Sequence, residues 1–593
     1  MAREGLDAFL VPRTDPWRGE WVAPSDERLA WLTGFTGSAG LAAVTSARAA
    51  LFVDGRYRLQ ARAQTDPALI EVVDAPPGRP EDWLAAALEP GARIGFDPWL
   101  HSVAELRRLE KALAPRGIAL VPAANLIDRI WSDRPARPAS PAEPWPERYA
   151  GASAAEKRAR IGAALAEAGE AGAVLTLPDS ICWLLNIRGR DVPRTPVLHA
   201  FALIDARGRV TLWTEPERFD AALRAALGPE VEIRAPGALP ADLAARAAAL
   251  GGPVRIDPAA CPEAIRRALA EAAVPLAEGE DPCQLPKACK TAAEIAATRE
   301  AHLRDGAAMV RFLAWLEPAL AEVAAGRARL TEIDIVRRLE AERVATGELV
   351  DLSFETICGA GPNGALPHYR VTEASNRAVA PGDLIVIDSG GQYRDGTTDV
   401  TRTLACGTPP PEARAAFTRV LRGMIAVSRL RWPEGLAGRD LDPFARAALW
   451  AAGLDYDHGT GHGVGVFLSV HEGPQRLSRL SEVPLQAGMI LSNEPGYYRE
   501  GAFGIRIENL VVVTPPEPIP GGDAHRPMHG FDTLTWVPIS RDLIEPALLS
   551  AEDRDWLDGY HAEVRRRLAP RLDRPEDAAA RAWLERATAP LGT

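Results

Sequence analysis

The chain has 593 residues, 47% of them apolar and 25% charged, so it can build three or four folded domains and is neither disordered nor a fibrous repeat. Its net charge of −12 argues against a nucleic acid as the main partner, because phosphate binding needs clustered Lys and Arg. No apolar stretch approaches the roughly 18 residues that cross a bilayer, and no apolar signal segment follows Met1, so we expect a cytoplasmic protein without a membrane partner.

The six cysteines are scattered and include no Cys-x-x-Cys pair. Disulfides and zinc–thiolate sites are therefore not expected, and we predict free thiols without a chemical role. These cysteines are Cys182, Cys261, Cys283, Cys289, Cys358 and Cys406.

The N-terminal half contains two segments with the same order of features. In each, a short apolar strand is followed by a tryptophan that lies six residues before a glycine, Trp31 to Gly37 in the first segment and Trp183 to Gly189 in the second. β-rich stretches and then Ala-rich helical stretches close both segments. We therefore predict two similar α/β domains.

Two breaks separate these segments from each other and from the rest of the chain. The stretch 133–146 contains five prolines, which favour an extended spacer over a helix or a central strand. A softer break lies at 275–290, where prolines and acidic residues precede a helix start. The predicted domains are 1–134, 147–283 and 284–593.

The third domain begins with the capping-box pattern Thr291-Ala-Ala-Glu294, which predicts a helix that ends at Glu317, before Pro318. Further helical patterns reach about Thr346. Strands and helices then segregate, which is typical of an α+β domain, and a charged helical tail after Ala551 is expected to be a solvated face. The strands are predicted at 384–387, 398–404, 489–491 and 505–513, and the later helices at 413–430 and 441–452.

Two aspartates lie eleven residues apart on a predicted hairpin. Asp388 ends the apolar run Leu-Ile-Val-Ile, where an unpaired charge costs several kcal/mol unless a metal or a turn compensates it. Asp399 lies on the return strand, after a turn predicted at Asp395-Gly396. A strict two-residue turn there would place Asp399 opposite Gln392, so we expect a bulge at the glycines that follow Ser389.

Four of the ten histidines lie between His368 and His471. His458 and His462 are four residues apart, but the glycines of His-Gly-Thr-Gly-His-Gly-Val-Gly make a helical zinc motif implausible and favour a close-approach loop or strand. Each histidine alone could be structural; together with the glycines they favour a site.

Two glutamates complete the acidic set. Glu494 ends the apolar strand Met-Ile-Leu-Ser-Asn, and Glu508 lies in Gly-Ile-Arg-Ile-Glu-Asn, where alternation places it on the same face as Arg506. A structural Arg506–Glu508 ion pair is the alternative interpretation. Asp388, Asp399 and the two glutamates carry four negative charges, which balance two divalent cations, and oxygen-dominated ligation favours Mn, Co or Mg over Zn.

The ordered set of these segments, from Asp-x10-Asp to Gly-Ile-Arg-Ile-Glu-Asn, resembles the pita-bread metallopeptidases, and most closely the long, three-domain aminopeptidase P family. The likeness extends from the Trp31 segment to His561. It implies two creatinase-N-like α/β domains followed by a pita-bread α+β catalytic domain. It also implies a homodimer, two manganese ions, and cleavage of peptides after an N-terminal residue that precedes proline.

The resemblance also implies roles for individual residues. The metal ligands would be Asp388, Asp399, His462, Glu494 and Glu508, with Glu494 also the proton acceptor. The residues around the substrate would be His368, His458, His471, Tyr498 and Arg506. Prolidase, methionine aminopeptidase and creatinase resemble the same catalytic fold but usually have at most one preceding domain, and a non-catalytic pita-bread binding protein is expected to lack ligands.

Overall fold

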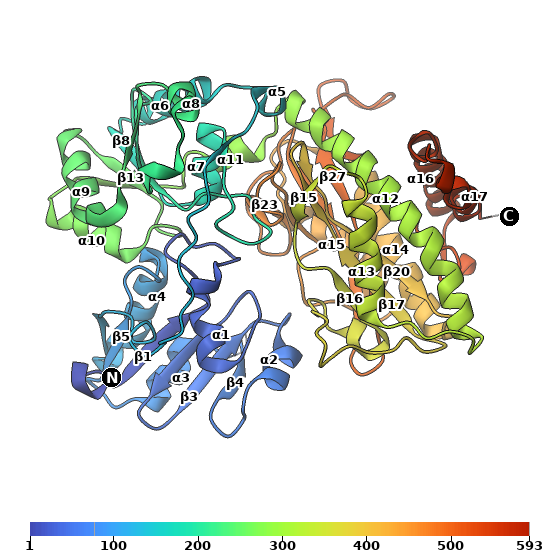
Figure 1. The fold of residues 1–593 in the computed structure, drawn as a ribbon, viewed down its shortest axis with the longest axis horizontal. Coiled ribbons are helices and arrows are strands. Elements are labelled where there is room, and N and C mark those ends of the chain that lie inside the picture. The colour runs from blue at the N-terminus through green and yellow to red at the C-terminus, as the bar shows by residue number, and fades with distance from the viewer. Residues whose placement is uncertain (76–77, 592–593) are drawn as a thin grey trace. The chain divides into compact units, whose positions relative to one another are not determined.

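The protein is described by a computed structural model that covers residues 1–75 and 78–591. The chain divides into two compact units, Met1–Lys287 and Ala288–Thr593. Figure 1 traces both units and labels their helices and strands.

The first unit contains two six-stranded sheets with the same strand order and pairing directions. When the six strands of each sheet are counted along the chain, the first strand pairs antiparallel with the second strand and parallel with the fifth. The predicted repeat is therefore confirmed. The first sheet has the order β4 (Glu71–Asp74), β3 (Ala49–Val53), β2 (Leu41–Thr45), β1 (Ala8–Pro12), β5 (Arg93–Phe96) and β6 (Ala119–Pro122). The second has the order β12 (Val231–Arg234), β11 (Val210–Trp213), β10 (Phe201–Asp205), β8 (Gly172–Leu175), β13 (Val254–Ile256) and β14 (Leu276–Glu278).

The two tryptophan motifs occupy equivalent helices but differ in burial. Trp31 lies on α1 (Arg28–Thr33) and is 39% exposed, whereas Trp183 lies on α7 (Pro178–Leu185) and is buried. The other elements of this unit are α2 (Arg58–Gln64), α3 (Pro80–Ala87), α4 (Val103–Leu113), α5 (Glu147–Ala150), α6 (Ala154–Glu167), α8 (Ala221–Leu227), α9 (Leu239–Ala249), α10 (Glu263–Glu271), α11 (Gln284–Ala288), β7 (Glu143–Pro144) and β9 (Ile187–Arg188).

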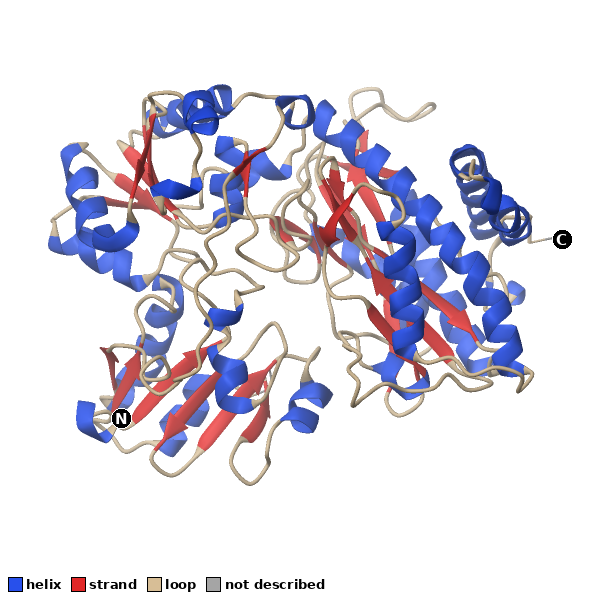
Figure 2. Ribbon diagram, viewed as in Figure 1, coloured by secondary structure: helices blue, strands red, loops and turns tan. Residues whose placement is uncertain are grey.

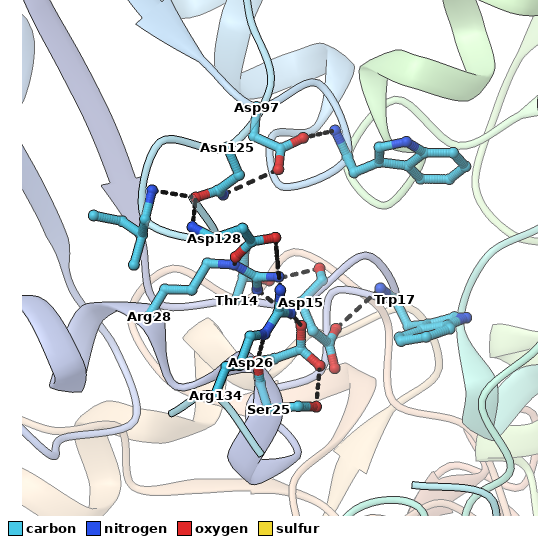
Figure 3. Close-up of polar contacts among 12 residues, drawn as sticks. Thr14, Asp15, Trp17, Ser25, Asp26, Arg28, Asp97, Asn125, Asp128 and Arg134 are labelled. Atoms are coloured by element: carbon cyan, nitrogen blue, oxygen red, sulfur yellow. Dashed lines mark hydrogen bonds and ion pairs between the residues drawn. The ribbon is translucent and has the colours of Figure 1, made fainter. Parts of the chain in front are cut away.

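A polar network fixes the start of the proline-rich connection to the first sheet domain (Figure 3). Arg28 pairs with Asp26 at 2.8 Å and with Asp128 at 2.6 Å. Arg134, the second residue of the connection, bonds the same two aspartates at 3.4 and 2.7 Å. Two arginines and two aspartates thus alternate around one cluster, and the charges compensate one another.

The second unit packs helices against strands (Figure 2). Its main core joins apolar residues of the long helix α12, of α14 and of the buried strand β17, such as Phe312, Phe417 and Ile387. The helices are α12 (Ala292–Ala324), α13 (Glu332–Val344), α14 (Pro411–Arg429), α15 (Gly438–Trp450), α16 (Ala551–Leu568) and α17 (Ala578–Ala587).

Several small antiparallel sheets form the rest of this unit. The largest has the order β23 (Glu472–Leu477), β22 (Gly461–Gly463), β24 (Ile490–Asn493), β27 (Asn509–Val513) and β29 (Phe531–Thr533). The others are β16 (Ile357–Ala360) with β17 (Leu384–Ser389) and β20 (Val400–Ala405), β15 (Leu349–Leu352) with β18 (Gly391–Tyr393) and β19 (Gly396–Thr397), β25 (Gly496–Arg499) with β26 (Phe503–Arg506), and β21 (Trp432–Pro433) with β28 (Met528–His529).

Two sequence expectations about this unit are wrong. The capping box at Thr291 and Glu294 is present, but α12 continues through Pro318 to Ala324. The buried face of α12 compensates there for the hydrogen bond that proline removes. The stretch 505–513 is not one strand, because β26 ends at Arg506, β27 begins at Asn509, and two residues lie between them.

The Asp388–Asp399 hairpin is irregular, but not through the expected bulge. The turn predicted at Asp395-Gly396 is wrong by one residue: it lies at Arg394–Asp395, since Tyr393 pairs with Gly396. Asp388 pairs with Thr401 in the same register, so no residue is inserted. Instead both strands are interrupted, at Gly390 and before β20. A Cβ at Gly390 would lie 1.9 Å from the Thr398 carbonyl oxygen, so the close approach requires glycine.

Two further findings concern the cysteines and the helices. No disulfide joins the six cysteines in the described residues, and five of the six are buried. Within residues 1–75 and 78–591, no helix combines the length and the apolar character that crossing a membrane requires.

Candidate metal centre

Four carboxylates from four different strand ends converge in the second unit. Asp388 is the fifth residue of β17, and Asp399 immediately precedes β20. Glu494 immediately follows β24, and Glu508 occupies the gap between β26 and β27. Strand ends suit this purpose because the backbone is fixed by the sheet while the side chain leaves the ladder.

His462 on β22 completes the set. Asp399, His462 and Glu508 each offer a ligand atom, and these atoms lie within 4.8 Å of one another. His462 Nδ1 lies 3.0 Å from the Gly463 carbonyl, so this nitrogen carries the proton and donates. Its Nε2 lone pair then faces carboxylate oxygens of Asp399 at 3.5 Å and Glu494 at 3.4 Å. Lone pairs that face one another at this distance require a cation or a proton between them.

Arg506 compensates one of the carboxylates. Its Nη2 bonds Asp388 Oδ2 at 2.6 Å, and its Nη1 bonds the Tyr498 hydroxyl at 2.6 Å. The ion pair considered from the sequence, Arg506 with Glu508, is replaced by the pair with Asp388. Asp388 therefore keeps only Oδ1 for another ligand.

The buried oxygens fit divalent cations. Asp388 Oδ1, Asp399 Oδ1 and Glu508 Oε1 are buried and have no hydrogen-bond partner within residues 1–75 and 78–591. Burial and the neighbouring Asp388 raise the pKa of Asp399 well above its usual value. Burial and the neighbouring Asp399 do the same to the pKa of Glu508, and burial with Glu508 raises the pKa of Glu494 to about 7. Hard, oxygen-binding cations would offset this repulsion.

His458 begins a chain of hydrogen bonds that leads to Asp388. Its Nδ1 donates to the Gly459 carbonyl at 2.7 Å, so its Nε2 accepts from the Tyr498 hydroxyl at 2.9 Å. Tyr498 in turn accepts from Arg506. The chain presents the Arg506 guanidinium beside the carboxylates, and its N–H groups that are not used by Thr401, Tyr498 or Asp388 are suitable donors to a developing oxyanion.

The remaining two predicted histidines are His471 and His368. The rings of His471 and His462 form an edge-to-face pair with centroids 4.2 Å apart. His368 is half-buried and lies three residues after the 3-10 helix Gly361–Ala365. That helix contacts β26 closely, because a Cβ on Gly504 would lie 1.7 Å from the Gly364 carbonyl oxygen.

The glycine-framed segment is the close-approach structure that the sequence predicted. A Cβ at Gly461 would lie 1.9 Å from the Ser492 carbonyl oxygen, so only glycine lets β22 lie this close to β24. The amide of Glu494 donates to the Thr460 carbonyl at 2.8 Å across the same contact. The sequence pattern thus brings His462 and Glu494 together.

Thr401 is a site residue that the sequence reasoning missed. Its hydroxyl donates to Glu508 Oε2 at 2.7 Å and accepts from Arg506 Nε at 3.2 Å. It lies two residues after Asp399, so strand alternation places both on one face. That alternation was the signal that could have identified it.

A buried ion pair between two helices holds the end of β17. Arg343 on α13 pairs with Asp305 on α12 at 2.7 Å and donates to the Ser389 carbonyl at 3.3 Å. The Tyr393 hydroxyl donates to the same aspartate at 2.7 Å. Two helices and the hairpin therefore fix the residue that follows Asp388.

Four regions of the chain match known protein families. Residues 1–130 and 133–294 match creatinase/prolidase N-terminal domains, residues 296–515 match metallopeptidase family M24, and residues 527–591 match the C-terminal region of peptidase M24.

Individual relatives match over most of their length. Aminopeptidase P2 from Arabidopsis thaliana is 39% identical over 99% of this chain and 86% of its own. The crystal structure of an X-prolyl aminopeptidase from Caenorhabditis elegans, described as a cytosolic enzyme with a di-nuclear active site, is 34% identical, with a TM-score of 0.93 over 99% of this chain and 95% of that one. An Xaa-Pro dipeptidase from Bacillus anthracis is 25% identical, with a TM-score of 0.52 over 65% of this chain and 99% of its own.

Proposed function

Because the chain belongs to metallopeptidase family M24, with aminopeptidase P enzymes as full-length relatives, we propose that it is an Xaa-Pro aminopeptidase. Its substrates are peptides with proline at the second position, and it hydrolyses the bond between the N-terminal residue and that proline. The observation that carries this proposal is the buried Asp399–His462–Glu508 cluster in a chain that matches an X-prolyl aminopeptidase from end to end.

We assign two divalent cations, manganese by preference over cobalt, to the residues Asp388, Asp399, His462, Glu494 and Glu508. The support is their donor set, four carboxylates and one neutral imidazole, and the unpartnered buried oxygens. When bound, the cations supply Lewis-acid chemistry, lowering the pKa of a water molecule and polarising the peptide carbonyl.

Glu494 is proposed as the proton acceptor. Burial and the charge of Glu508 raise its pKa to about 7, close to the value that suits proton transfer near neutral pH. Its Oε1 also accepts from Ser492 Oγ at 3.1 Å, which orients the carboxylate beside His462. Glu494 can therefore hold a proton during attack and release it to the leaving amine.

The substrate is oriented by side chains around the carboxylates. Arg506 is assigned as the donor to the carbonyl oxygen as it acquires charge, and Tyr498, which accepts from Arg506, keeps the guanidinium in place on the substrate side. His458 holds the Tyr498 hydroxyl, and we assign His471 and His368 to the two flanks of the bound peptide. These five substrate-side residues, together with the five proposed metal ligands, make up the proposed active site.

We further propose the domain limits 1–134, 147–283 and 284–593, which follow the matched family regions to within about a dozen residues. We also propose a homodimer through the third domain, as the resemblance to the aminopeptidase P family implies. A cytoplasmic location is supported by the cytosolic character of the Caenorhabditis elegans enzyme.

A prolidase-like dipeptidase is the competing function, because the catalytic fold is shared. The Bacillus anthracis dipeptidase, however, matches only 65% of this chain, whereas the X-prolyl aminopeptidase matches 99%. A non-catalytic binding protein of this fold would not need to retain all five acidic and imidazole ligand positions.

A peptide panel distinguishes these functions. Metal-stripped protein that has been reloaded with Mn²⁺ is incubated with an Xaa-Pro dipeptide, an Xaa-Pro-Xaa tripeptide and a Met-Ala tripeptide. We expect release of the N-terminal residue from the Xaa-Pro-Xaa tripeptide. Cleavage of the dipeptide alone would assign a prolidase, and cleavage of Met-Ala alone would assign a methionine aminopeptidase.

A further inference from the structure

A buried ion pair on α15 lies directly behind the loop that carries His458. Arg446 bonds Asp442, one helical turn earlier, through Nε at 2.7 Å and Nη2 at 3.2 Å. The two side chains are 3% and 0% exposed. Because desolvation offsets most of the attraction in such a pair, stability alone is a weak reason for its presence.

The same guanidinium holds the backbone of the loop. Arg446 Nη1 donates to the Tyr456 carbonyl at 2.8 Å, and Nη2 donates to the His458 carbonyl at 2.7 Å. Nη1 also bonds Asp455 Oδ1 at 2.8 Å, and the guanidinium carbon lies 3.8 Å from the centre of the Tyr456 ring. The planar Arg446 guanidinium, whose N–H groups have fixed directions, therefore holds the loop at several points.

We call the Arg446–Asp442 pair and its bonds to the loop the clamp, and Asp442 connects it to the strand end that carries Glu494. Its Oδ1 accepts from Thr460 Oγ1 at 2.6 Å, and Thr460 Oγ1 lies 2.5 Å from the Tyr456 hydroxyl. The Thr460 carbonyl accepts from the Glu494 amide. One buried ion pair is thus connected to the backbone of His458 and to that of Glu494.

We propose that Arg446, held by Asp442, is a positioning residue for the reaction. It fixes the backbone of His458 so that the imidazole accepts from the Tyr498 hydroxyl; that hydroxyl accepts from Arg506, and this keeps the guanidinium aimed at the substrate carbonyl. The inference rests on the proposed peptidase function, because it assigns Arg446 a part in that reaction.

The first test compares Arg446→Met, Arg446→Lys and a matched control. Arg446→Met should lower kcat on an Xaa-Pro-Xaa tripeptide by about 100-fold, as small displacements of catalytic groups do, with little change in KM. Arg446→Lys should recover less than about a tenth of the loss, because one ammonium cannot reach both carbonyls. The control, Arg439→Met, removes an exposed pair with Glu482 from the same helix and should leave kcat within about twofold of wild type.

The second test separates positioning from stability. Arg446→Met removes the close partner of the buried Asp442 and leaves Arg479 Nε at 3.9 Å from it, so it should lower the unfolding temperature, whereas Asp442→Asn combined with Arg446→Met removes both charges and should restore much of it. We expect kcat to stay low in this double variant. If kcat returned together with the unfolding temperature, the pair would be structural only and the proposal would be overturned.

The third test asks whether Arg446 acts through His458. In a His458→Gln background, Arg446→Met should lower kcat by less than about threefold, since the group it positions is already gone. An additive, about 100-fold loss would contradict the proposal. Hydrogen exchange gives an activity-independent readout: Arg446→Met should speed exchange in 455–462 and at the Glu494 amide, and Arg439→Met should not. Wild-type protein without peptidase activity would refute the proposed function, while this exchange would still test the clamp.

Discussion

Asp399 is the most crowded carboxylate of the site, and its crowding has a measurable cost. It is buried beside Asp388 and Glu494, and its Oδ1 has no hydrogen-bond partner among the described residues. Because cations are required to compensate this repulsion, the residues that bind metal should destabilise the metal-free protein.

Replacing Asp399 by Asn tests this at the residue scale. The neutral amide should raise the stability of the metal-free protein at pH 8, because it removes a charge that burial and Asp388 disfavour, and should lower turnover at saturating Mn²⁺ by about 100-fold or more. Thermal unfolding without metal and a peptide assay measure the two effects. Near-normal turnover, or a less stable metal-free variant, would contradict this role.

His561 on α16 predicts a pH dependence of stability away from the site. Burial lowers the pKa of His561 to about 3, and its Nε2 accepts from the Ile539 amide at 3.1 Å. Between about pH 6.5 and 3 the unfolded chain therefore binds a proton that the folded chain does not, and stability falls as the pH falls.

The variant His561→Gln should remove this contribution, which amounts to about 1.4 kcal/mol per pH unit below pH 6. Calorimetry of the unfolding transition from pH 7 to pH 4.5 measures the slope. His525→Gln is the control, since that side chain is 77% exposed. Equal slopes for wild type and His561→Gln would refute the assignment.

At the scale of elements, the sequence predicts what local patterns determine. Apolar runs and a turn signal predict the hairpin of Asp388 and Asp399. The glycines around His462 predict that its segment lies close to a neighbouring backbone. The sequence does not predict that β26 and β27 separate at Glu508, because the gap depends on contacts with Thr401. Likewise α12 passes through Pro318 because tertiary packing overrides a local helix breaker.

The supporting contacts could not be predicted for a different reason. Some contacts that fix the strand carrying Asp388 join residues distant in sequence. Arg343, for example, bonds Asp305 and the Ser389 carbonyl. No periodicity or spacing in one chain specifies such partners. The proposed ligands therefore follow from sequence patterns, whereas the residues that position them do not.

The contact between β26 and the 3-10 helix before His368 yields a prediction for two elements. Gly504→Ala would place a Cβ 1.7 Å from the Gly364 carbonyl oxygen, so the helix must move and displace His368. We expect kcat/KM for an Xaa-Pro-Xaa tripeptide to fall by about 100-fold. Gly559→Ala, on α16 with open space around it, is the control and should be neutral or slightly stabilising. Full activity of Gly504→Ala would show that this contact is not required.

At the scale of the whole molecule, the chain joins a duplicated α/β unit to an α+β unit that contains the metal centre. The fold of both units follows from the repeated strand order and from helices segregated against antiparallel sheets. All the proposed chemistry lies between Asp388 and Glu508, with His368 on its border. The central claim is therefore that this one region binds two metal ions and cleaves Xaa-Pro peptides with them.

A metal titration of the stripped protein tests that claim most directly. Turnover of an Xaa-Pro-Xaa tripeptide is measured beside the bound Mn²⁺ per chain as Mn²⁺ is added. The two-metal account predicts that binding saturates at two ions per chain in wild type and that full turnover requires the second. Full turnover of the metal-free protein, or a plateau of turnover with no ion bound to the region of Asp399 and His462, would contradict it.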